Sequence, residues 1–298
     1  MRKVLLASTA LFALSSVSAM AADISISGAT ELVLDMGDSA TADDSAFATE
    51  HDIAITFSNT TDSGITTSMT YGIDDDGTPD DAETTISGDF GEIRFTQAGD
   101  EHALNDIDID GSATAEENFS RTVAQGASTL HEIGGIGTHH VTYVLPSLVD
   151  GLYVAGSVAN VAGANGEAAS YGIRYSASGF TATYGQVKGQ VVTTTHAGVA
   201  ASFGDIGVSF AQNTDDTTGE DRKAVLMGAT YAMGDITIGY ESEAIENGTA
   251  TSDEKHTAIG ASYSIAPGLS ASLTMAESDK MQGQTDTAFT SIGVHISF

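Results

Sequence analysis

The chain has 298 residues, with ten lysines and arginines against 41 acidic residues, and it contains no cysteine. Its formal net charge of −31 at pH 7 excludes nucleic acid as a partner, because a phosphate backbone repels so acidic a surface. The lack of cysteine excludes a fold that depends on disulfide bonds.

The first residues have the pattern of a secretory signal peptide. A basic start at residues 2–3 is followed by an apolar run at 4–17 and by the small residues of a cleavage site at 19–21. The alternative, an ordinary buried helix, is disfavoured because the three parts come in the expected order. No later stretch supplies the ~20 consecutive apolar residues of a membrane helix. We therefore predict a signal peptide at 1–21 and one exported domain at 22–298.

Sixteen later segments alternate apolar and polar residues. In one of them, Ile53, Ile55 and Phe57 share one face, and Ala54 and Thr56 share the other. This period of two indicates strands that present one face to apolar surroundings. Because sixteen is an even number, the strands can close into an antiparallel barrel with both chain ends at one rim. The predicted strand cores are residues 24–34, 50–59, 64–73, 82–88, 91–97, 139–145, 151–160, 168–177, 179–187, 193–203, 205–212, 222–233, 235–242, 255–265, 268–276 and 287–298.

The connections between these segments are alternately short and long. The short ones are turn-like, such as Gly-Asp-Phe-Gly at 88–91 and Met-Gly-Asp at 233–235. A transmembrane barrel has one rim of tight turns and one of longer loops, whereas a soluble β-sandwich has no reason to sort its connections in this way. We therefore predict a membrane barrel and keep the sandwich as the alternative. The long connections hold 29 of the 41 acids and lie near 35–49, 74–81, 98–138, 161–167, 188–192, 213–221, 243–254 and 277–286.

The two faces of the predicted strands differ in chemistry. Serine, threonine, glycine and alanine dominate the polar faces, which suits a wide interior filled with water, while the apolar faces would contact lipid. Aromatic residues often lie near strand ends, as expected for girdles at the two membrane interfaces. The candidates for these girdles are Tyr71, Tyr153, Tyr171, Tyr184, Phe203, Tyr240 and Tyr263.

The connection at 98–138 is far longer than the others. Structureless loops of this length are usually functional or disordered. Its single basic residue is Arg121, against the acids Asp100, Glu101, Asp106, Asp108, Asp110, Glu116, Glu117 and Glu132. From the residues alone, two arrangements stay open: the loop folds inward and narrows a channel, or it forms an external flap that its charges keep solvated.

Two motifs resemble the alphaproteobacterial general-diffusion porins. They are Thr-Thr-Asp-Ser-Gly at 60–64 and the hairpin Ile-Ser-Gly-Asp-Phe-Gly-Glu-Ile at 86–93, and the chain ends on Phe298 as those porins do. The resemblance implies an all-β fold, a sixteen-stranded antiparallel transmembrane β-barrel whose long third loop folds into the pore. It also implies a homotrimer in the outer membrane of a Gram-negative bacterium, passive diffusion of ions and small hydrophilic solutes, and no enzymatic step.

The resemblance further implies a pore constriction in which acids of the third loop face basic residues of the wall. The residues that match these roles are Asp106, Asp108, Asp110, Glu116 and Glu117 on the loop, with Arg94, Arg174 and Arg121 as the basic partners. Arg94 and Arg174 lie on the polar faces of their strands, and an arginine turned to lipid would cost about 2–4 kcal/mol. His140 is a further wall candidate. Because a well-populated arginine cluster is absent from the sequence, we expect a preference for cations.

Other chemistry finds less support. His139 and His140 are adjacent on a strand and point to opposite faces, so they do not share a zinc ion. The acidic stretches 74–77 and 106–111 resemble fragments of calcium loops without completing an EF-hand. No nucleophile motif occurs, which disfavours a barrel enzyme.

We therefore expect no required cofactor. Weak calcium or magnesium binding by the carboxylate clusters stays open. The expected partners are outer-membrane lipid and lipopolysaccharide, small hydrophilic solutes and cations, and further copies of the chain. The remaining alternative is a secreted soluble β-protein that binds divalent cations or partners through its acidic loops.

Overall fold

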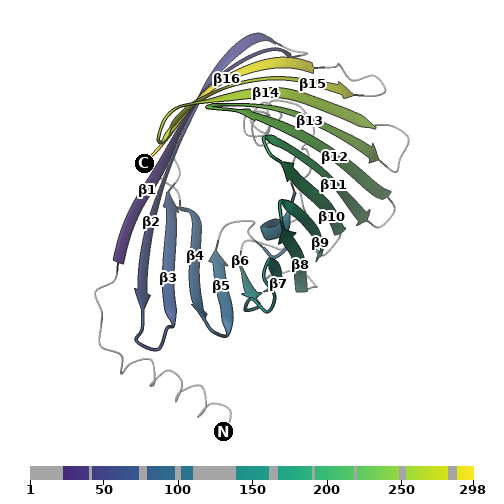
Figure 1. Ribbon diagram of the computed structural model, residues 1–298. Helices are drawn as coiled ribbons and strands as arrows, with labels where there is room; N and C mark the ends of the chain where they lie inside the picture. The colour runs from purple at the N-terminus through teal and green to yellow at the C-terminus, as the bar shows by residue number, and fades with distance from the viewer. Residues whose placement is uncertain are drawn as a thin grey trace.

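The computed structural model is a closed antiparallel barrel of sixteen strands (Figure 1). It describes residues 23–39, 42–73, 79–97, 102–109, 139–160, 167–189, 192–217, 220–247, 253–280 and 287–298. The predicted all-β fold and strand number are confirmed. The predicted signal peptide lies outside the described residues, so it stays a prediction. Within the described residues, no helix has the length and apolar character needed to cross a membrane.

Each strand pairs with its neighbours in the chain. The strands are β1 (Asp23–Ser39), β2 (Ala42–Thr60), β3 (Thr66–Ile73), β4 (Pro79–Gly88), β5 (Gly91–Gln97), β6 (His139–Val144), β7 (Leu152–Asn160), β8 (Glu167–Ala177), β9 (Phe180–Lys188), β10 (Val192–Phe203), β11 (Ile206–Thr217), β12 (Glu220–Met233), β13 (Ile236–Asn247), β14 (Glu254–Ala266), β15 (Leu269–Lys280) and β16 (Thr287–Ser297), with a short 3-10 helix η1 (Asn105–Ile107).

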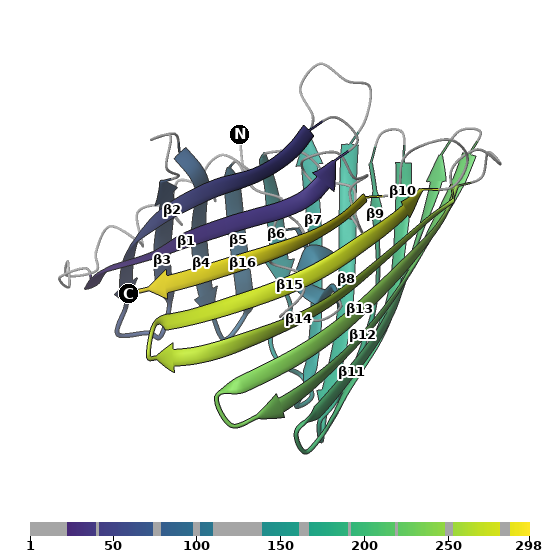
Figure 2. The ribbon, with the colours of Figure 1, turned by 90° about the horizontal axis from the view of Figure 1, so that it is seen from above.

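The barrel closes where β1 lies between β2 and β16 (Figure 2). Leu32 pairs with Val294 in this seam, and two further bonds join Gly28 and Phe298, each donating its N–H to the other's carbonyl oxygen at 3.0 Å. Closure leaves no unpaired strand edge, which is what a strand-built protein needs to cross lipid.

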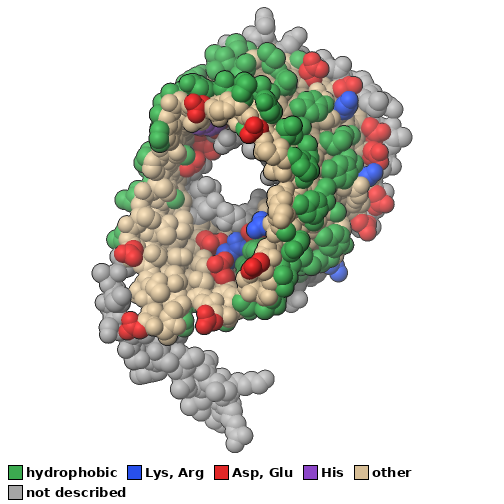
Figure 3. Space-filling model, viewed as in Figure 1, with side chains coloured by type: hydrophobic (Ala, Val, Ile, Leu, Met, Phe, Trp, Pro, Cys, Tyr) green, Lys and Arg blue, Asp and Glu red, His purple; other side chains and the backbone are tan. Residues whose placement is uncertain are grey.

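The outer surface of the barrel is apolar. Hydrophobic side chains cover it (Figure 3). On β11, the side chains of Ile206, Val208 and Phe210 are 42–48 % exposed, while Ala211 faces the interior and is buried. Fully burying a side chain of this size contributes about 1.5–3 kcal/mol. An apolar face repeated around a closed barrel therefore favours a lipid environment, and the period-two pattern of the sequence is what produces it.

Several strands run further into the acidic connections than the alternation predicts. β11 was expected to end at 212 and β13 at 242, and they continue to Thr217 and Asn247. The ladder of main-chain hydrogen bonds needs no apolar face, and outward pairs of opposite charge such as Lys223 with Glu246 support it. Residues 213–217, 220–221, 243–247 and 254 are therefore strand, which corrects in part the prediction of the spans 213–221 and 243–254 as long loops.

We call the edge that carries the tight turns the turn rim, and the opposite edge the loop rim. At the turn rim, Gly204 and Gly234 adopt φ of 62° and 63°, a conformation that favours glycine. The wall is lowest where β5 and β6 meet, with seven and six residues against fourteen in β12. The long connection at 98–138 leaves and re-enters the wall at this low point.

Candidate functional site

The described part of the long connection lies against the inner surface of the barrel. We call residues 102–109 the inner segment, and its helix η1 contacts β8 and β9 (Figure 1). Leu104 and Ile107 are buried in one cluster with the wall residues Ala159, Ala168 and Val187. A second cluster joins Ile109 to Ala211 and Leu226. The inner segment thus spans the wall from β7 to β12, while residues 98–101 and 110–138 lie outside the described residues.

Three inward glycines on neighbouring strands make room for the inner segment. A Cβ added at Gly172 would lie 2.1 Å from the carbonyl oxygen of Ala103, and one at Gly185 would lie 2.5 Å from Leu104 Cδ1. A Cβ at Gly198 would lie 3.1 Å from Ile109 Cβ. Glycine within a strand often marks a close approach of another backbone, and here it produces the seat of the inner segment.

Arg94 of β5 and Asp106 of η1 form a two-pronged ion pair. Arg94 Nη1 lies 3.0 Å from Asp106 Oδ1, and Arg94 Nη2 bonds Asp106 Oδ2. The Tyr153 hydroxyl on β7 donates to Asp106 Oδ2 at 2.5 Å. The side chains of Arg94 and Asp106 are only 12 % and 15 % exposed. Parallel charge-assisted bonds of this kind are among the stronger polar contacts in proteins, so the pair fastens η1 to the wall.

Arg174 of β8 supports the same point from the other side. Its Nη1 donates to the main-chain oxygen of Asp106 at 2.9 Å, and its guanidinium carbon lies 4.9 Å from the centre of the Tyr153 ring. This second contact is a cation–π interaction. Tyr153 therefore faces the lumen, which corrects its prediction as a residue of the aromatic girdle.

Further carboxylates surround the arginine pair. Glu92 Oε1 lies 3.4 Å from Arg94 Nε, and Glu83 Oε2 lies 3.9 Å from Arg94 Nη1. Together with Asp106, three carboxylates thus accompany two guanidinium groups. The positive charge of Arg94 is compensated where it stands, and the three carboxylates outnumber the two guanidinium groups.

A second anchor holds the other end of the inner segment. Asp108 Oδ1 lies 3.1 Å from Nδ1 of His196, a fully buried histidine on β10. Asn213 Oδ1 lies 2.8 Å from the same nitrogen, and the Thr183 hydroxyl lies 2.9 Å from Nε2. The inner segment is therefore tied to the wall by polar contacts at Asp106 and Asp108 and by the apolar packing of Leu104, Ile107 and Ile109.

Four of the eight predicted constriction residues are thus brought together on the inner wall: Asp106, Asp108, Arg94 and Arg174. The loop acid Asp106 touches the basic residues directly and does not face them across open water. The other four lie outside the described residues: Asp110, Glu116, Glu117 and Arg121. That these eight residues determine which ions pass stays a prediction.

The sequence prediction missed acids on a different part of the wall. Glu31 and Asp35 of β1 and Glu50 and Asp52 of β2 occupy inward positions, and these two strands contain no lysine or arginine. Ser291 donates to Asp35 Oδ1 at 2.6 Å, and His295 Nδ1 lies 3.5 Å from Glu31 Oε1. The alternation carries this signal, because the large apolar residues of the two strands, Val33 excepted, have the opposite parity to these acids.

More inward acids follow on β13 and β14. Glu241 and Glu243 are buried on β13, and Glu254 of β14 lies 3.4 Å from His256 Nε2. Charged side chains are visible inside the opening of the barrel, whereas hydrophobic ones cover its outer surface (Figure 3). The lumen wall therefore carries fixed negative charge on several strands.

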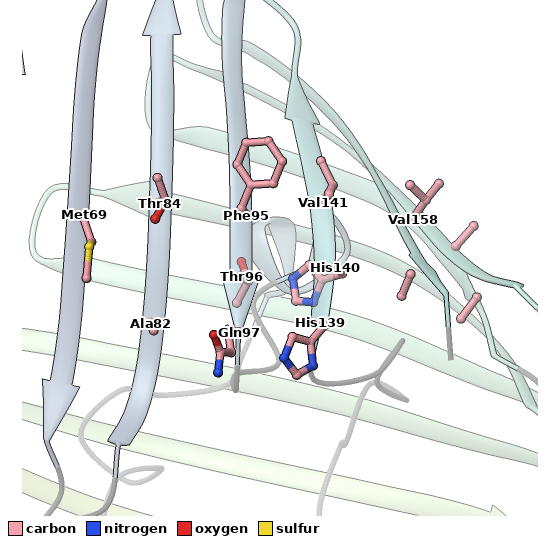
Figure 4. A pocket seen from close by; sticks show the side chains of 13 residues that line it. Met69, Ala82, Thr84, Phe95, Thr96, Gln97, His139, His140, Val141 and Val158 are labelled. Atoms are coloured by element: carbon pink, nitrogen blue, oxygen red, sulfur yellow. The ribbon is translucent and has the colours of Figure 1, made fainter. Parts of the chain in front are cut away.

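The two neighbouring histidines of β6 point to opposite faces, as the sequence predicts (Figure 4). His140 is buried inside, with its ring centre 6.5 Å from that of His102, whereas His139 is exposed. Among the described residues, no three histidines, aspartates or glutamates are grouped to hold a metal ion. The calcium-like fragment at 106–111 is described up to residue 109, and its Asp106 and Asp108 carboxylates contact Arg94 and His196.

Comparison with known proteins gives a consistent result. The sequence matches the profile of the Gram-negative porin family over residues 7–283. Three solved structures that resemble the chain are a porin refined at 1.8 Å, an anion-selective porin from Comamonas acidovorans and a trimer form of OmpT from Vibrio cholerae. Their sequence identities are 17 %, 11 % and 15 %, and their TM-scores are 0.73, 0.69 and 0.66. The matches cover 93 %, 93 % and 94 % of this chain and the whole of each structure.

A search among curated protein sequences finds no significant match to this chain. The predicted alphaproteobacterial branch of the resemblance stays a prediction.

Proposed function

Given that the chain belongs to the Gram-negative porin family, whose members are passive outer-membrane channels and not enzymes, we propose that it prefers cations over anions. The observation that carries this proposal is the acidic inner wall of β1 and β2, with Glu31, Asp35, Glu50 and Asp52 at inward positions. Of the basic residues at the inner segment, Arg94 contacts the carboxylates of Glu83, Glu92 and Asp106, and Arg174 donates to the main-chain oxygen of Asp106. The anion-selective relative shows that this fold alone does not decide the sign of selectivity.

The size of the effect follows from Coulomb's law. In water, one carboxylate lowers the energy of a monovalent cation ~10 Å away by ~0.4 kcal/mol, which is a factor of about two in local concentration. Several fixed carboxylates on one side of a narrow passage add to this field, and salt screens it over about 10 Å at 0.1 M. We therefore infer that selectivity is strongest at low ionic strength.

Neutralising the pair Glu31→Gln and Glu50→Gln is expected to lower the ratio of cation to anion permeability about twofold or more. The two residues are directly opposite each other in the register of β1 and β2. Because like charges at such positions repel, the double variant should fold at least as well as the wild type. The reversal potential across a planar bilayer with a salt gradient measures the ratio.

The matched control for this variant is Glu277→Gln. Glu277 is exposed on the outer face of β15, and its replacement removes one negative charge outside the lumen, against the two that the double variant removes inside it. Its reversal potential should equal that of the wild type. Equal shifts in the control and the double variant would mean that the lumen acids do not set the selectivity.

We further infer that the pore constriction is formed by the long connection, with Asp106, Asp108, Asp110, Glu116 and Glu117 and the arginines 94, 174 and 121. The support is the position of the inner segment, which is packed on the lumen wall through Leu104 and Ile107. Ions and small hydrophilic solutes would pass beside it by diffusion.

A homotrimer is the proposed assembly. The outward face of β3–β8 supports it, because the outward side chains that the structure describes there include no lysine, arginine, aspartate or glutamate and include the apolar Met69, Phe95 and Val141. A hollow of about 800 Å³ lies on this face near the loop rim, lined by these three side chains and by Val158 (Figure 4). Apolar side chains of a second copy would fill it, and a trimer form is known for the relative OmpT.

Insertion of the trimer is expected to open three channels together. In single-channel records, a voltage that closes the channels should reduce the current of one inserted trimer in three equal steps. Replacing Val141 and Val158 with aspartate should disrupt assembly, since a buried unpaired charge at an interface is strongly unfavourable. Records dominated by single steps from the wild type would contradict the trimer.

The proposed lipid partners fit the outer face of the taller strands. Lys223 and Lys255 lie outward near the loop rim, above apolar residues such as Met227 and Ile259. Lysine at the edge of an apolar band can reach lipid phosphates, including those of lipopolysaccharide. No cofactor is needed for diffusion, and weak calcium or magnesium binding would involve the carboxylate clusters of the acidic connections.

A further inference from the structure

One buried histidine connects the inner segment to the wall, through its own strand and the two strands on either side of it. His196 of β10 contacts Asp108 of the inner segment, Thr183 of β9 and Asn213 of β11. The histidine is fully buried, and both of its ring nitrogens lie within 3.1 Å of a polar atom. Arg94 holds the middle of the inner segment at Asp106, so His196 is the polar anchor nearest to residue 110, where the undescribed remainder of the connection begins.

We propose that His196 is a positioning residue for the channel, which fastens the Asp108 end of the inner segment to the wall and fastens it more tightly when its ring carries a proton. The proposal rests on the proposed channel function and adds to it a residue that makes the conducting state respond to pH.

The hydrogen-bond chemistry of the site allows both protonation states without rearrangement. A neutral ring donates from Nδ1 to Asp108 or Asn213 and accepts at Nε2 from the Thr183 hydroxyl. A protonated ring donates from both nitrogens, and the Thr183 oxygen then accepts while its own hydrogen rotates away. The Asp108 contact changes from a hydrogen bond to an ion pair, which is stronger where water is excluded.

The surroundings of His196 favour this response. The carboxylate that faces it is Asp108, and its contacts on β9 and β11 are uncharged. The next carboxylate along β11 is Asp215, which accepts a hydrogen bond from Thr194 at 2.6 Å. Histidine is the side chain whose unperturbed charge change falls between pH 5 and 8.

The test is a planar-bilayer record of the wild type at about pH 5.5 and about pH 8, which bracket the ordinary titration of histidine. An inner segment that leaves the wall enters the water path, so its departures appear as brief reductions of current. For the wild type we expect these reductions to be about tenfold rarer at the lower pH, because protonation adds an attraction between opposite charges to the hydrogen bond that the neutral ring already makes.

The variant His196→Gln cannot take up a proton, so its current reductions should be equally frequent at both pH values. Asp108→Asn keeps the histidine but removes the carboxylate, and it should lose the pH response as well. The control is His256→Gln, because His256 is also buried on the lumen side but lies on β14 beside Glu254. This control should keep the response of the wild type.

Two results would overturn the inference: a wild-type pH response that survives in both His196→Gln and Asp108→Asn, or a response that His256→Gln abolishes. Both leave the channel function in place. A wild-type preparation that conducts no current would contradict the proposed function itself, so the two failures are distinguishable.

Discussion

Replacing Arg94 with glutamine is expected to detach the inner segment from the wall and to make the channel more strongly cation-selective. Arg94 is mostly buried and bonds both oxygens of Asp106, with Glu83 and Glu92 close by. Removing one partner of a buried ion pair costs about 3–5 kcal/mol, because the remaining carboxylates keep their charge without compensation. The expected record shows frequent current fluctuations and a permeability ratio shifted about twofold toward cations.

Two companion variants separate the roles of charge and attachment. Asp106→Asn breaks the same pair from the other side, so it should loosen the inner segment equally while shifting selectivity away from cations. Arg94→Lys keeps the charge, so its selectivity should stay near that of the wild type. Lysine cannot bond two carboxylate oxygens in parallel, so the current should fluctuate more often than in the wild type and less often than in Arg94→Gln. If Arg94→Gln and Asp106→Asn both show the quiet current of the wild type, the pair does not hold the segment.

Replacing Gly172 with alanine is expected to displace the inner segment without disturbing the barrel. The new Cβ would lie 2.1 Å from the Ala103 carbonyl oxygen and 2.8 Å from Ile107 Cγ1, far inside van der Waals contact. Overpacking of this kind typically costs about 1–3 kcal/mol. Because the chain has no cysteine, Asn105→Cys can carry a single spin label on η1, and its spectrum should become much more mobile in the Gly172→Ala background.

The matched control is Gly156→Ala. Gly156 lies on β7 opposite Tyr171, and the nearest atom to its added Cβ is 3.8 Å away, which is ordinary contact. The label on η1 should keep the spectrum of the wild type. A label that stays immobile in Gly172→Ala would mean that the glycine row is not the seat of the segment.

Local pattern made the barrel predictable from sequence. The period of two in segments such as 206–211 reports which face meets lipid, and it needs no knowledge of distant residues. The cost of an arginine in lipid likewise placed Arg94 and Arg174 toward the lumen. Tyr153 has the same parity as the inward residues Ala155 and Ala159 of β7, so the alternation predicts its position better than the preference of tyrosine for membrane interfaces does.

Features that depend on the path of the chain in space could not be predicted. The pairing of Arg94 with Asp106 requires the long connection to turn inward, and the residues alone left that open. The glycines at 172, 185 and 198 look like ordinary small residues until another backbone approaches them. Strand extension into 213–217 was missed because a ladder between polar residues carries no apolar signal.

The reversal potential of the wild type in a planar bilayer tests the account most directly. With a tenfold gradient of potassium chloride at low ionic strength, a water-filled channel with an acidic inner wall should give a potential of the sign expected for potassium permeation. The double variant Glu31→Gln and Glu50→Gln should bring that potential closer to zero, because it removes two of the acids of the inner wall. A wild-type potential of the opposite sign would contradict the cation preference, and a bilayer that stays non-conducting would contradict the channel.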